Sequence, residues 1–475
     1  MRYLTENPTL ETGKFVGASL GGAIGFLSDP EPRATSGRNR RTIARSVSVA
    51  ALLLTLAVVA FTEPQSSTAP PVYWVVRYGQ SLSVGYIGFC ASPGYPACSV
   101  GIPGNLMMWS PMYPPSGGFQ ALQEKVYQNS PPSVESSATS MCNQYTTFSG
   151  HVCATANYGW PGASYPELAK GATCTVGSNC FFDNAIGLSY TTSITSPPTT
   201  GTGVVQAAAN AAKMGAAFFA PAVYYNQGET EMLSSSITDV MYEQYMVKLQ
   251  SDFQTSINSA IGQAGLVPLF LVQKSNWPGY SAYTPLAGSN NGGSVIGQLE
   301  AALDHYSDGT IWMIGPEYPN EYNGGVHMTA NGYRTNGGRE GKVMHQVTVE
   351  GTPWRPFVPR SITLSGTLLR VRFWVPMAPL VFDSTTITPL PDGNKGFEVT
   401  DTGGSGVTIS SVALTDGETD SVDITLSGTP ASTVELRYAW TAPTLGVSGH
   451  AGGPRGQVAD SDFRVVSSFL CKRLC

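Results

Sequence analysis

The sequence predicts an α/β fold with a mostly parallel sheet, followed by a β-sandwich. Between residues 71 and 350, short β-branched apolar runs alternate with stretches whose apolar residues recur at helical spacing. That alternation is typical of a parallel sheet covered by helices. From about residue 352, short stretches of alternating polarity are separated by Gly, Pro, Asp and Thr turns, as in sandwiches. We therefore expect an α/β domain over 71–350 and a β-sandwich domain over 351–475.

The elements of the α/β domain follow from these patterns in order. The apolar run 72–78 predicts the first strand, and the Ala-rich stretch 204–214 predicts a helix that ends at Gly215. The remaining predictions are strands at 222–225, 269–272 and 311–314 and helices over 237–261 and 296–303. In the second domain, strands are expected at 362–364, 368–375, 406–409, 421–426 and 434–440.

Residues 1–70 are expected to form an N-terminal extension that ends in a linker. A basic cluster at 38–45 precedes an apolar run at 46–61. This run is short for a membrane span but suits the core of a signal peptide. The sequence therefore predicts a secreted or extracytoplasmic protein, with an uncleaved membrane anchor at 46–61 or a buried helix as the alternatives.

The composition excludes several classes of function. Charged residues make up 12% of the chain and the net charge is -6, so no basic surface is expected for nucleic acid. No Cys-x-x-Cys and no histidine pair at metal-ligand spacing occurs, and neither a phosphate-binding loop nor a dinucleotide fingerprint is present. The sequence predicts neither a metal nor a cofactor.

The cysteines indicate an exported protein. Six of them form three sequence-close pairs in a loop-rich region, and two more, Cys471 and Cys475, lie near the end. Connectivity does not follow from sequence alone. Local bridges would pin the long loops there, joining Cys90 to Cys98, Cys142 to Cys153, and Cys174 to Cys180.

Two residues predict nucleophilic catalysis. Ser81 follows the first predicted strand in the small-residue turn Gly-Gln-Ser at 79–81, and His327 follows the last predicted strand of this domain. Ligands of parallel sheets bind at the carboxyl ends of the strands. A serine held there, with a distant histidine to accept its proton, indicates a serine esterase.

Four blocks of sequence resemble the motifs of SGNH hydrolases, specifically the sialate O-acetylesterase-like branch. They are Gly-Gln-Ser at 79–81, Asn-Tyr-Gly-Trp-Pro-Gly-Ala-Ser at 157–164, Asn-Gln-Gly-Glu-Thr at 226–230 and Gly-Val-His-Met-Thr at 325–329. Their order and spacing match the family, and Leu-Arg-Tyr-Ala-Trp at 436–440 extends the likeness into the second domain. The resemblance covers roughly residues 72–463 and implies a three-layer, flavodoxin-like hydrolase domain.

The resemblance also implies a role for each residue of the site. Ser81 is the expected nucleophile and His327 the general base. The oxyanion hole would consist of the N–H groups of Ser81 and Gly162 and the amide of Gln227. For Gln227 the alternative is a polar residue that only holds loops in place. The supporting residues are Gln80, Glu229 and Asn323, of which Glu229 would orient the substrate or the loop that carries Gln227.

One position departs from the family pattern. The family usually has an aspartate three residues before the histidine, and this chain has Gly324 there. In a serine protease, replacing the aspartate of the triad while its geometry is kept lowers turnover about 10⁴-fold. The imidazole would then be oriented by a backbone carbonyl, by Asn323, or by Glu317 or Glu321, as a dyad or with a substituted acid.

The family implies acetylated carbohydrate, or another small ester, as substrate. Two alternatives stay open: a non-catalytic carbohydrate-binding or structural protein with a decayed site, and an esterase of longer acyl chains, which requires a larger apolar pocket. Four aromatic residues are candidates for stacking on sugar rings, or are simply core aromatics: Tyr86, Trp160, Tyr224 and Trp277.

Overall fold

The computed structural model describes residues 69–471 except 92, 109–117, 125, 128–129, 173–180, 188–202, 233–236, 275–292, 324, 444–446, 463–465 and 468. All described residues belong to one compact unit. The apolar run 46–61, with the predicted signal peptide or anchor, lies outside them. Among the helices in the described ranges, none is long and apolar enough to cross a membrane.

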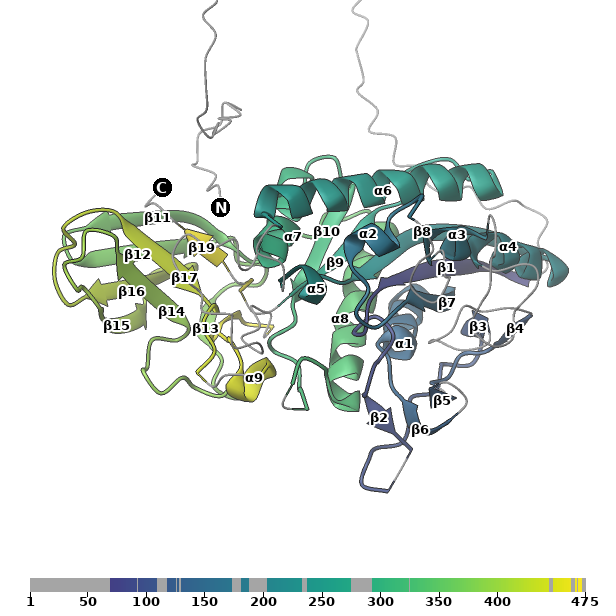
Figure 1. Ribbon diagram of the computed structural model, residues 1–475, viewed down its shortest axis with the longest axis horizontal. Helices are drawn as coiled ribbons and strands as arrows, with labels where there is room; N and C mark the ends of the chain where they lie inside the picture. Colours follow the sequence, from purple (N-terminus) through teal and green to yellow (C-terminus); the bar gives the residue numbers. More distant parts are fainter. Residues whose placement is uncertain are drawn as a thin grey trace, which may run out of the picture. The chain divides into compact units, whose positions relative to one another are not determined.

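A seven-stranded sheet dominates the first part of this unit (Figure 1). Its strand order is β10-β9-β8-β1-β7-β3-β4. Every neighbouring pair is parallel except β3 with β4, which confirms the predicted mostly parallel sheet. The strands are β1 (Ala69–Gly79), β3 (Leu106–Met108), β4 (Phe119–Ala121), β7 (Val152–Gly159), β8 (Ala216–Asn226), β9 (Leu269–Gln273) and β10 (Ile311–Pro316).

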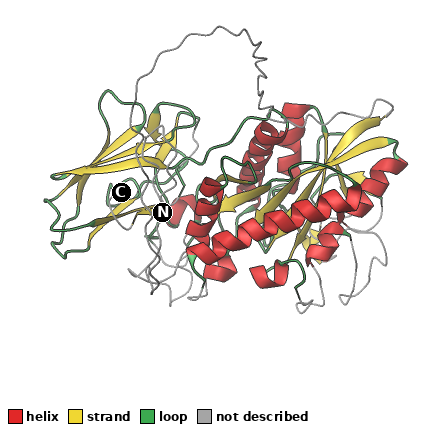
Figure 2. Cartoon of the chain, turned by 90° about the horizontal axis from the view of Figure 1, so that it is seen from above, coloured by secondary structure: helices red, strands yellow, loops and turns green. Residues whose placement is uncertain are grey.

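Helices cover both faces of this sheet (Figures 1 and 2). Alternate side chains of a strand point to opposite faces. On β1, Trp74 and Val76 belong to a buried cluster with α3 (Phe181–Ile186), α4 (Gly203–Lys213), α6 (Asp239–Ile261) and α7 (Gly293–Asp304). Tyr73 and Val75 belong to a second cluster with α1 (Ala138–Ser149) and α8 (Ala330–Thr348). The central strand is therefore buried on both sides, as its continuous apolar sequence predicts.

Helices α1 and α8 meet backbone to backbone. A Cβ atom added at Gly337 would lie 2.4 Å from the carbonyl oxygen of Ser137, and one at Gly341 would lie 2.3 Å from that of Met141. No side chain larger than a hydrogen fits at these two positions of α8. The N-terminus of α8 is capped by Thr329, whose Oγ1 accepts a hydrogen bond from the Gly332 N–H at 3.1 Å.

Two disulfides are present, as predicted from the spacing. Cys90 pairs with Cys98, and Cys142 of α1 pairs with Cys153 of β7. The predicted third bridge, from Cys174 to Cys180, lies outside the described residues, as does Cys475.

Several small elements connect the layers and were not predicted. A three-stranded antiparallel sheet has the order β2-β6-β5. These elements are β2 (Phe89–Cys90), β5 (Val126–Tyr127), β6 (Ser130–Val134), α2 (Tyr165–Leu168) and α5 (Glu229–Met232).

The C-terminal part is rich in antiparallel strands, as predicted. Its sheets have the orders β11-β12-β16-β15, β14-β17-β19 and β13-β18. The elements are β11 (Pro359–Ser365), β12 (Leu368–Phe373), β13 (Leu380–Phe382), β14 (Phe397–Asp401), β15 (Ile409–Leu414), β16 (Ser421–Leu426), β17 (Val434–Tyr438), α9 (Gly449–Gly452), β18 (Val458–Asp460) and β19 (Phe469–Cys471). The strand predicted at 406–409 starts only at Ile409, because Gly406 has a φ of 69° that a strand does not allow.

Candidate active site at the carboxyl ends of the strands

A glycine turn at the end of β1 places Ser81. Gly79 has a φ of 137°, and a Cβ atom there would lie 2.0 Å from the carbonyl oxygen of Asn226, so only glycine fits. The Gln80 N–H donates to that same oxygen at 3.0 Å, and the Trp160 N–H donates to the Gly79 carbonyl at 3.1 Å. The carboxyl ends of β1, β7 and β8 are thus tied together directly beneath Ser81.

The hydroxyl group of Ser81 has no fixed partner. Ser81 is 5% exposed, and its carbonyl oxygen accepts a hydrogen bond from the Tyr86 N–H at 3.0 Å. Within the described ranges, neither its Oγ nor its N–H makes a hydrogen bond. The next residue, Leu82, packs in a small buried cluster with Met328 and Tyr333. This cluster joins the serine turn to the segment that carries His327.

His327 lies in a tight loop before α8. The Asn323 N–H donates to the His327 carbonyl oxygen at 3.1 Å, and the half-buried imidazole lies 4.9 Å, between ring centroids, from Tyr86. Burial lowers the pKa of His327, while Glu229 raises it and Lys274 lowers it. The ring is therefore favoured in its neutral form, which a general base requires.

The residues considered as partners of the imidazole lie in different places. Asn323 is exposed, and its Oδ1 accepts a hydrogen bond from the Gly325 N–H at 3.4 Å. Glu321 is also exposed, whereas Glu317 is buried. Gly324 is outside the described residues. Between the residues that the structure describes, no hydrogen bond joins the His327 ring to Ser81 or to a carboxylate.

A buried charge cluster lies beside this loop, and sequence reasoning missed its central member. Lys274 follows β9 and is fully buried, with its Nζ 2.9 Å from Glu229 Oε1 and 2.8 Å from Glu317 Oε1. It also donates to Asn226 Oδ1. Burial disfavours the charge of Lys274, but the two carboxylates outweigh this and raise its pKa. A lone lysine two residues after the apolar run 269–272 was the available signal.

The two carboxylates of the cluster differ in their second oxygen. Burial raises the pKa of Glu317 to about 7, against the opposing charge of Lys274. Glu317 Oε2 accepts a hydrogen bond from the Tyr322 hydroxyl at 3.4 Å. Glu229 is 8% exposed, and its Oε2 accepts no hydrogen bond from the residues in the described ranges. Glu229 is therefore the carboxylate of this cluster with a vacant acceptor.

The structure places the amide of Gln227 among loop contacts. Gln227 is fully buried, and its Nε2 donates to the Ala163 carbonyl at 3.2 Å and to Glu231. Its Oε1 accepts from the hydroxyls of Tyr225 and Tyr242 at 3.0 and 2.8 Å. Both amide hydrogens are thus engaged, which is the geometry of a residue that holds loops in place.

Gly162 and Gln80 both contact the hydroxyl group of Thr230. The Thr230 Oγ1 lies 3.0 Å from Gln80 Oε1 and 3.1 Å from the Gly162 carbonyl oxygen, both of which are acceptors. Gly162 has a φ of 80°, and its N–H meets no acceptor among the residues that are described. Within the described part of the chain, the N–H groups of Ser81 and Gly162 therefore have no acceptor, unlike those of the Gln227 amide.

Of the four candidate stacking residues, Tyr224 is a core residue. It is fully buried, and the Arg77 guanidinium lies 4.1 Å from its ring centroid. The same guanidinium pairs with Glu340 of α8 at 2.6 Å. Tyr86 and Trp160 are half-buried, and Trp277 is outside the described residues. Within those residues, no group of three or more His, Cys, Asp or Glu side chains is placed to hold a metal ion.

Comparisons with known proteins find similarity in structure rather than in sequence. No protein-family model matches the chain, and no curated protein matches its sequence. A carbohydrate acetylesterase from Xanthomonas citri has a similar fold, with a TM-score of 0.53 and 13% identity over 84% of this chain and 80% of that chain. A protein from Arabidopsis thaliana matches at a TM-score of 0.37 and 12% identity, over 59% of this chain and 100% of that chain.

Proposed function

We propose that the protein is a serine esterase that removes acetyl or other short acyl groups from carbohydrate. The observation that carries the proposal is the Ser81 hydroxyl, which has no hydrogen-bond partner among the described residues and lies at the carboxyl end of β1 on a turn that packs against the His327 segment. The similarity in fold to a carbohydrate acetylesterase supports it, as does the resemblance of the sequence blocks to SGNH hydrolases of the sialate O-acetylesterase-like branch.

The proposed reaction proceeds through an acyl-enzyme. Ser81 Oγ attacks the ester carbonyl carbon while a ring nitrogen of His327 takes the hydroxyl proton. The bond to the sugar oxygen breaks, and the imidazolium returns the proton to that oxygen. A water molecule then attacks the acyl carbon while His327 takes one of its protons. The bond between the acyl carbon and Ser81 Oγ breaks, and the imidazolium returns the proton to Oγ, which leaves the carboxylic acid and free Ser81.

We assign the oxyanion hole to the N–H groups of Ser81 and Gly162. Both donors lack a protein acceptor in the described part of the chain, so both can bond to a developing oxyanion. Gln227 takes a positioning role, because its Nε2 bonds to the carbonyl of Ala163, the neighbour of Gly162. Gln80 holds the same loop through Thr230.

We further propose that Glu229 supplies the negative charge that His327 needs. Its Oε2 has no partner among described residues, and its charge raises the pKa of the imidazole. Lys274 Nζ lies 2.9 Å from Glu229 Oε1 and offsets part of the cost of burying this carboxylate. With Glu229 in this role, catalysis does not require the aspartate that the family has at the position of Gly324.

Export completes the proposal. The two disulfides form and persist in oxidising compartments, and the apolar run 46–61 remains a predicted signal peptide or membrane anchor. The C-terminal antiparallel sheets are proposed to form a separate β-sandwich over 351–475.

The direct test is release of acetate from p-nitrophenyl acetate and from an acetylated sugar. Ser81→Ala is expected to lower turnover by at least about 10³-fold, because no other group replaces the nucleophile. Ser149→Ala, at a half-buried serine on α1, is the matched control and should leave turnover unchanged. An inert wild-type protein would favour a carbohydrate-binding role, and faster hydrolysis of octanoyl than acetyl esters would favour the longer-chain alternative.

The role of Glu229 is tested by the pKa of His327, followed by NMR of the imidazole. Glu229→Gln removes a charge that raises this pKa, so the pKa is expected to fall and the acidic limb of kcat/KM to move to lower pH. Glu321→Gln, at an exposed carboxylate six residues before His327, is the control. An unchanged His327 pKa in Glu229→Gln would show that another group orients the ring.

A further inference from the structure

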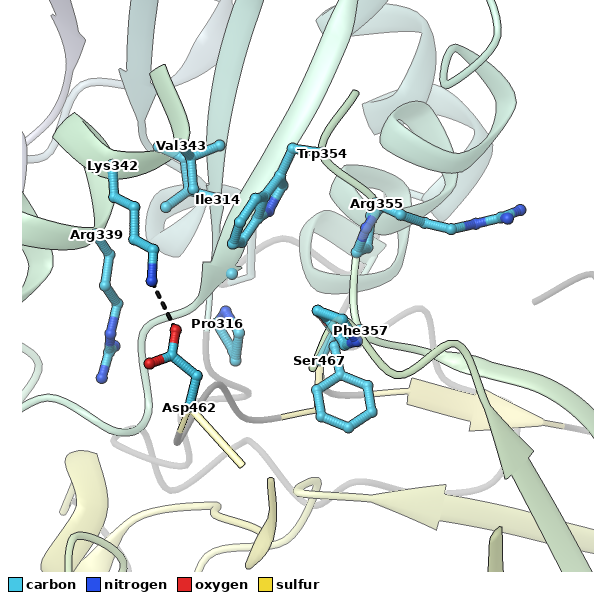
Figure 3. Close-up of a pocket in the computed structure, with 13 residues that line it drawn as sticks. Ile314, Pro316, Arg339, Lys342, Val343, Trp354, Arg355, Phe357, Asp462 and Ser467 are labelled. Carbon is cyan, nitrogen blue, oxygen red and sulfur yellow. Dashed lines mark hydrogen bonds and ion pairs between the residues drawn. The ribbon is translucent and has the colours of Figure 1, made fainter. Parts of the chain in front are cut away.

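A pocket lies where the end of β10 and the helix α8 meet the C-terminal part of the chain (Figure 3). Its volume is about 160 Å³. It is lined by residues of β10, of α8, of the segment 354–357 and of the C-terminal part, among them Arg339, Lys342 and Asp462. None of these residues belongs to the proposed catalytic site. Strand β10 is three strands away from β1 in the sheet order, or about 14 Å at the spacing of neighbouring strands.

The pocket contains a cation without a counter-ion. Lys342 of α8 points at Asp462, and the two are paired at 2.6 Å (Figure 3). Arg339, one turn earlier on the same helix, lies beside Lys342 and donates from Nη1 to Asn320 Oδ1 at 3.2 Å. No carboxylate of the described residues lies within ion-pair distance of Arg339. Its remaining N–H donors are therefore available to a ligand.

The other arginine of the pocket is already engaged. Arg355 extends away from Arg339 and Lys342 (Figure 3), and its guanidinium lies 3.8 Å from the Trp374 ring centroid and 4.8 Å from that of Tyr306. Burial lowers the pKa of Arg339 to about 10, which still leaves it charged at neutral pH. Arg339 is half-buried, and removing an unpaired charge even partly from water has a cost that an anion in the pocket would reduce.

The other residues that line the pocket are mainly apolar, and they form a surface against which a six-membered ring can pack. Trp354 and Phe357 contribute aromatic side chains, and Ile314, Val343 and Pro316 contribute aliphatic ones. A cavity of about 150 Å³ with apolar walls holds one benzene molecule. The pocket is therefore of the size of one six-membered ring, with a cation at its edge.

We propose that this pocket binds a carboxylate carried on a six-membered ring, with Arg339 as the partner of the carboxylate. The planar guanidinium matches a carboxylate through two parallel hydrogen bonds. Such a group is found in uronic acid units of glycans and in small aromatic acids. The site is independent of the proposed esterase reaction, so a binding measurement alone tests it.

The test is calorimetric titration of the whole protein with galacturonate, benzoate and their neutral counterparts, galactose and benzyl alcohol. At least one acid is expected to bind about tenfold or more tightly than its neutral counterpart, as a charge-assisted bond implies. Tighter binding of galacturonate identifies an acidic glycan, and tighter binding of benzoate identifies an aromatic acid. Equal binding of acid and neutral partner, or no binding of either acid, would overturn the proposal.

Variants locate the binding in the pocket. Arg339→Gln keeps a donor for Asn320 but removes the charge, and it should weaken binding of the acid about tenfold while leaving the neutral counterpart unaffected. Arg339→Lys keeps the charge but loses the two parallel N–H donors of the guanidinium. It replaces the glutamine variant in this test if that variant does not fold. Arg372→Gln, on β12 outside the pocket, makes the same change of net charge. Equal loss in Arg339→Gln and Arg372→Gln would mean that the anion responds to overall charge and binds elsewhere.

Discussion

Two groups of ion pairs in the molecule differ in burial. At the carboxyl ends of β8, β9 and β10, Lys274 lies between Glu229 and Glu317 with an exposed fraction of 0% for its side chain. In the C-terminal part, Arg370 and Arg372 of β12 pair with acidic residues at side-chain exposures of 22–35%. The first cluster lies beside the candidate active site, and the second lies on a sheet with no proposed chemistry.

The difference shows which charges depend on a partner in the folded protein and which are solvated by water. Water solvates the charges on β12 whether or not they are paired, so their pairing adds little stability. The buried cluster exists only because each member offsets the desolvation of another. This cluster lies at the strand ends, and the proposed site gives it a role there.

The largest expected effect is that of Lys274→Met. Removal of the lysine leaves two buried carboxylates without their shared cation, so the free energy of unfolding at pH 8 should fall by about 3–5 kcal/mol. Lys274 also opposes the raised pKa of Glu317, and in the variant that carboxyl should bind a proton more readily. The loss should therefore be smaller at pH 5 than at pH 8, as measured by urea unfolding.

Two further variants check this result. Lys248→Met, on α6, removes a lysine whose side chain is 60% exposed and paired with Asp252 at 2.7 Å, and should cost roughly 0.5 kcal/mol or less. Lys274→Met combined with Glu317→Gln should be more stable than Lys274→Met alone at pH 8. If both lysine variants lose the same stability, burial does not distinguish the two kinds of ion pair.

Glu231 sharpens the comparison, because this buried carboxylate forms no ion pair with a described residue. Burial raises its pKa to about 7, so the folded state binds its proton more tightly than the unfolded state. The stability from this proton is present below about pH 4.5 and is lost as pH rises to 7, on the order of 3 kcal/mol in total. In Glu231→Gln the free energy of unfolding should fall less between pH 5 and 8 than in wild type. Equal slopes in the two proteins would mean that Glu231 titrates as an exposed residue.

The smallest effect is expected on the exposed sheet. Arg370 bonds both oxygens of Asp423, at 2.7 and 2.9 Å, and lies near Glu418. Arg370→Met should lower the urea midpoint slightly, and the difference from wild type should shrink in 1 M salt, where screening acts over about 3 Å. A loss comparable to that of Lys274→Met, and insensitive to salt, would remove the distinction between the regions.

Much of the sheet was predictable because its strands carry a local signal. The runs 72–78, 269–272 and 311–314 are apolar and β-branched, and each lies within an observed strand. The two observed disulfides were predictable for the same reason, since their partners are close in sequence. The short strands β2, β5 and β6 escaped prediction because two to five residues are too few for periodicity.

The candidate site was only partly predictable, because its contacts are made between distant segments. Ser81 and His327 were found from their positions after strands. The contacts of Lys274 with Glu229 and Glu317 depend on strand order, which brings residues more than 40 positions apart to one edge. Whether Gln227 faces a substrate or Ala163 depends on loop packing, which no spacing rule describes.

The seam between α1 and α8 bears on how this chain can change over evolutionary time. Gly337 and Gly341 carry no reactive group, yet they set how closely α8 approaches its neighbour, and His327 comes three residues before that helix begins. A methyl group at either glycine would push the helix outward and take the histidine with it. Descendants of this chain can therefore lose the geometry of the proposed site through a change at a position with no functional side chain, while every recognisable motif is still intact.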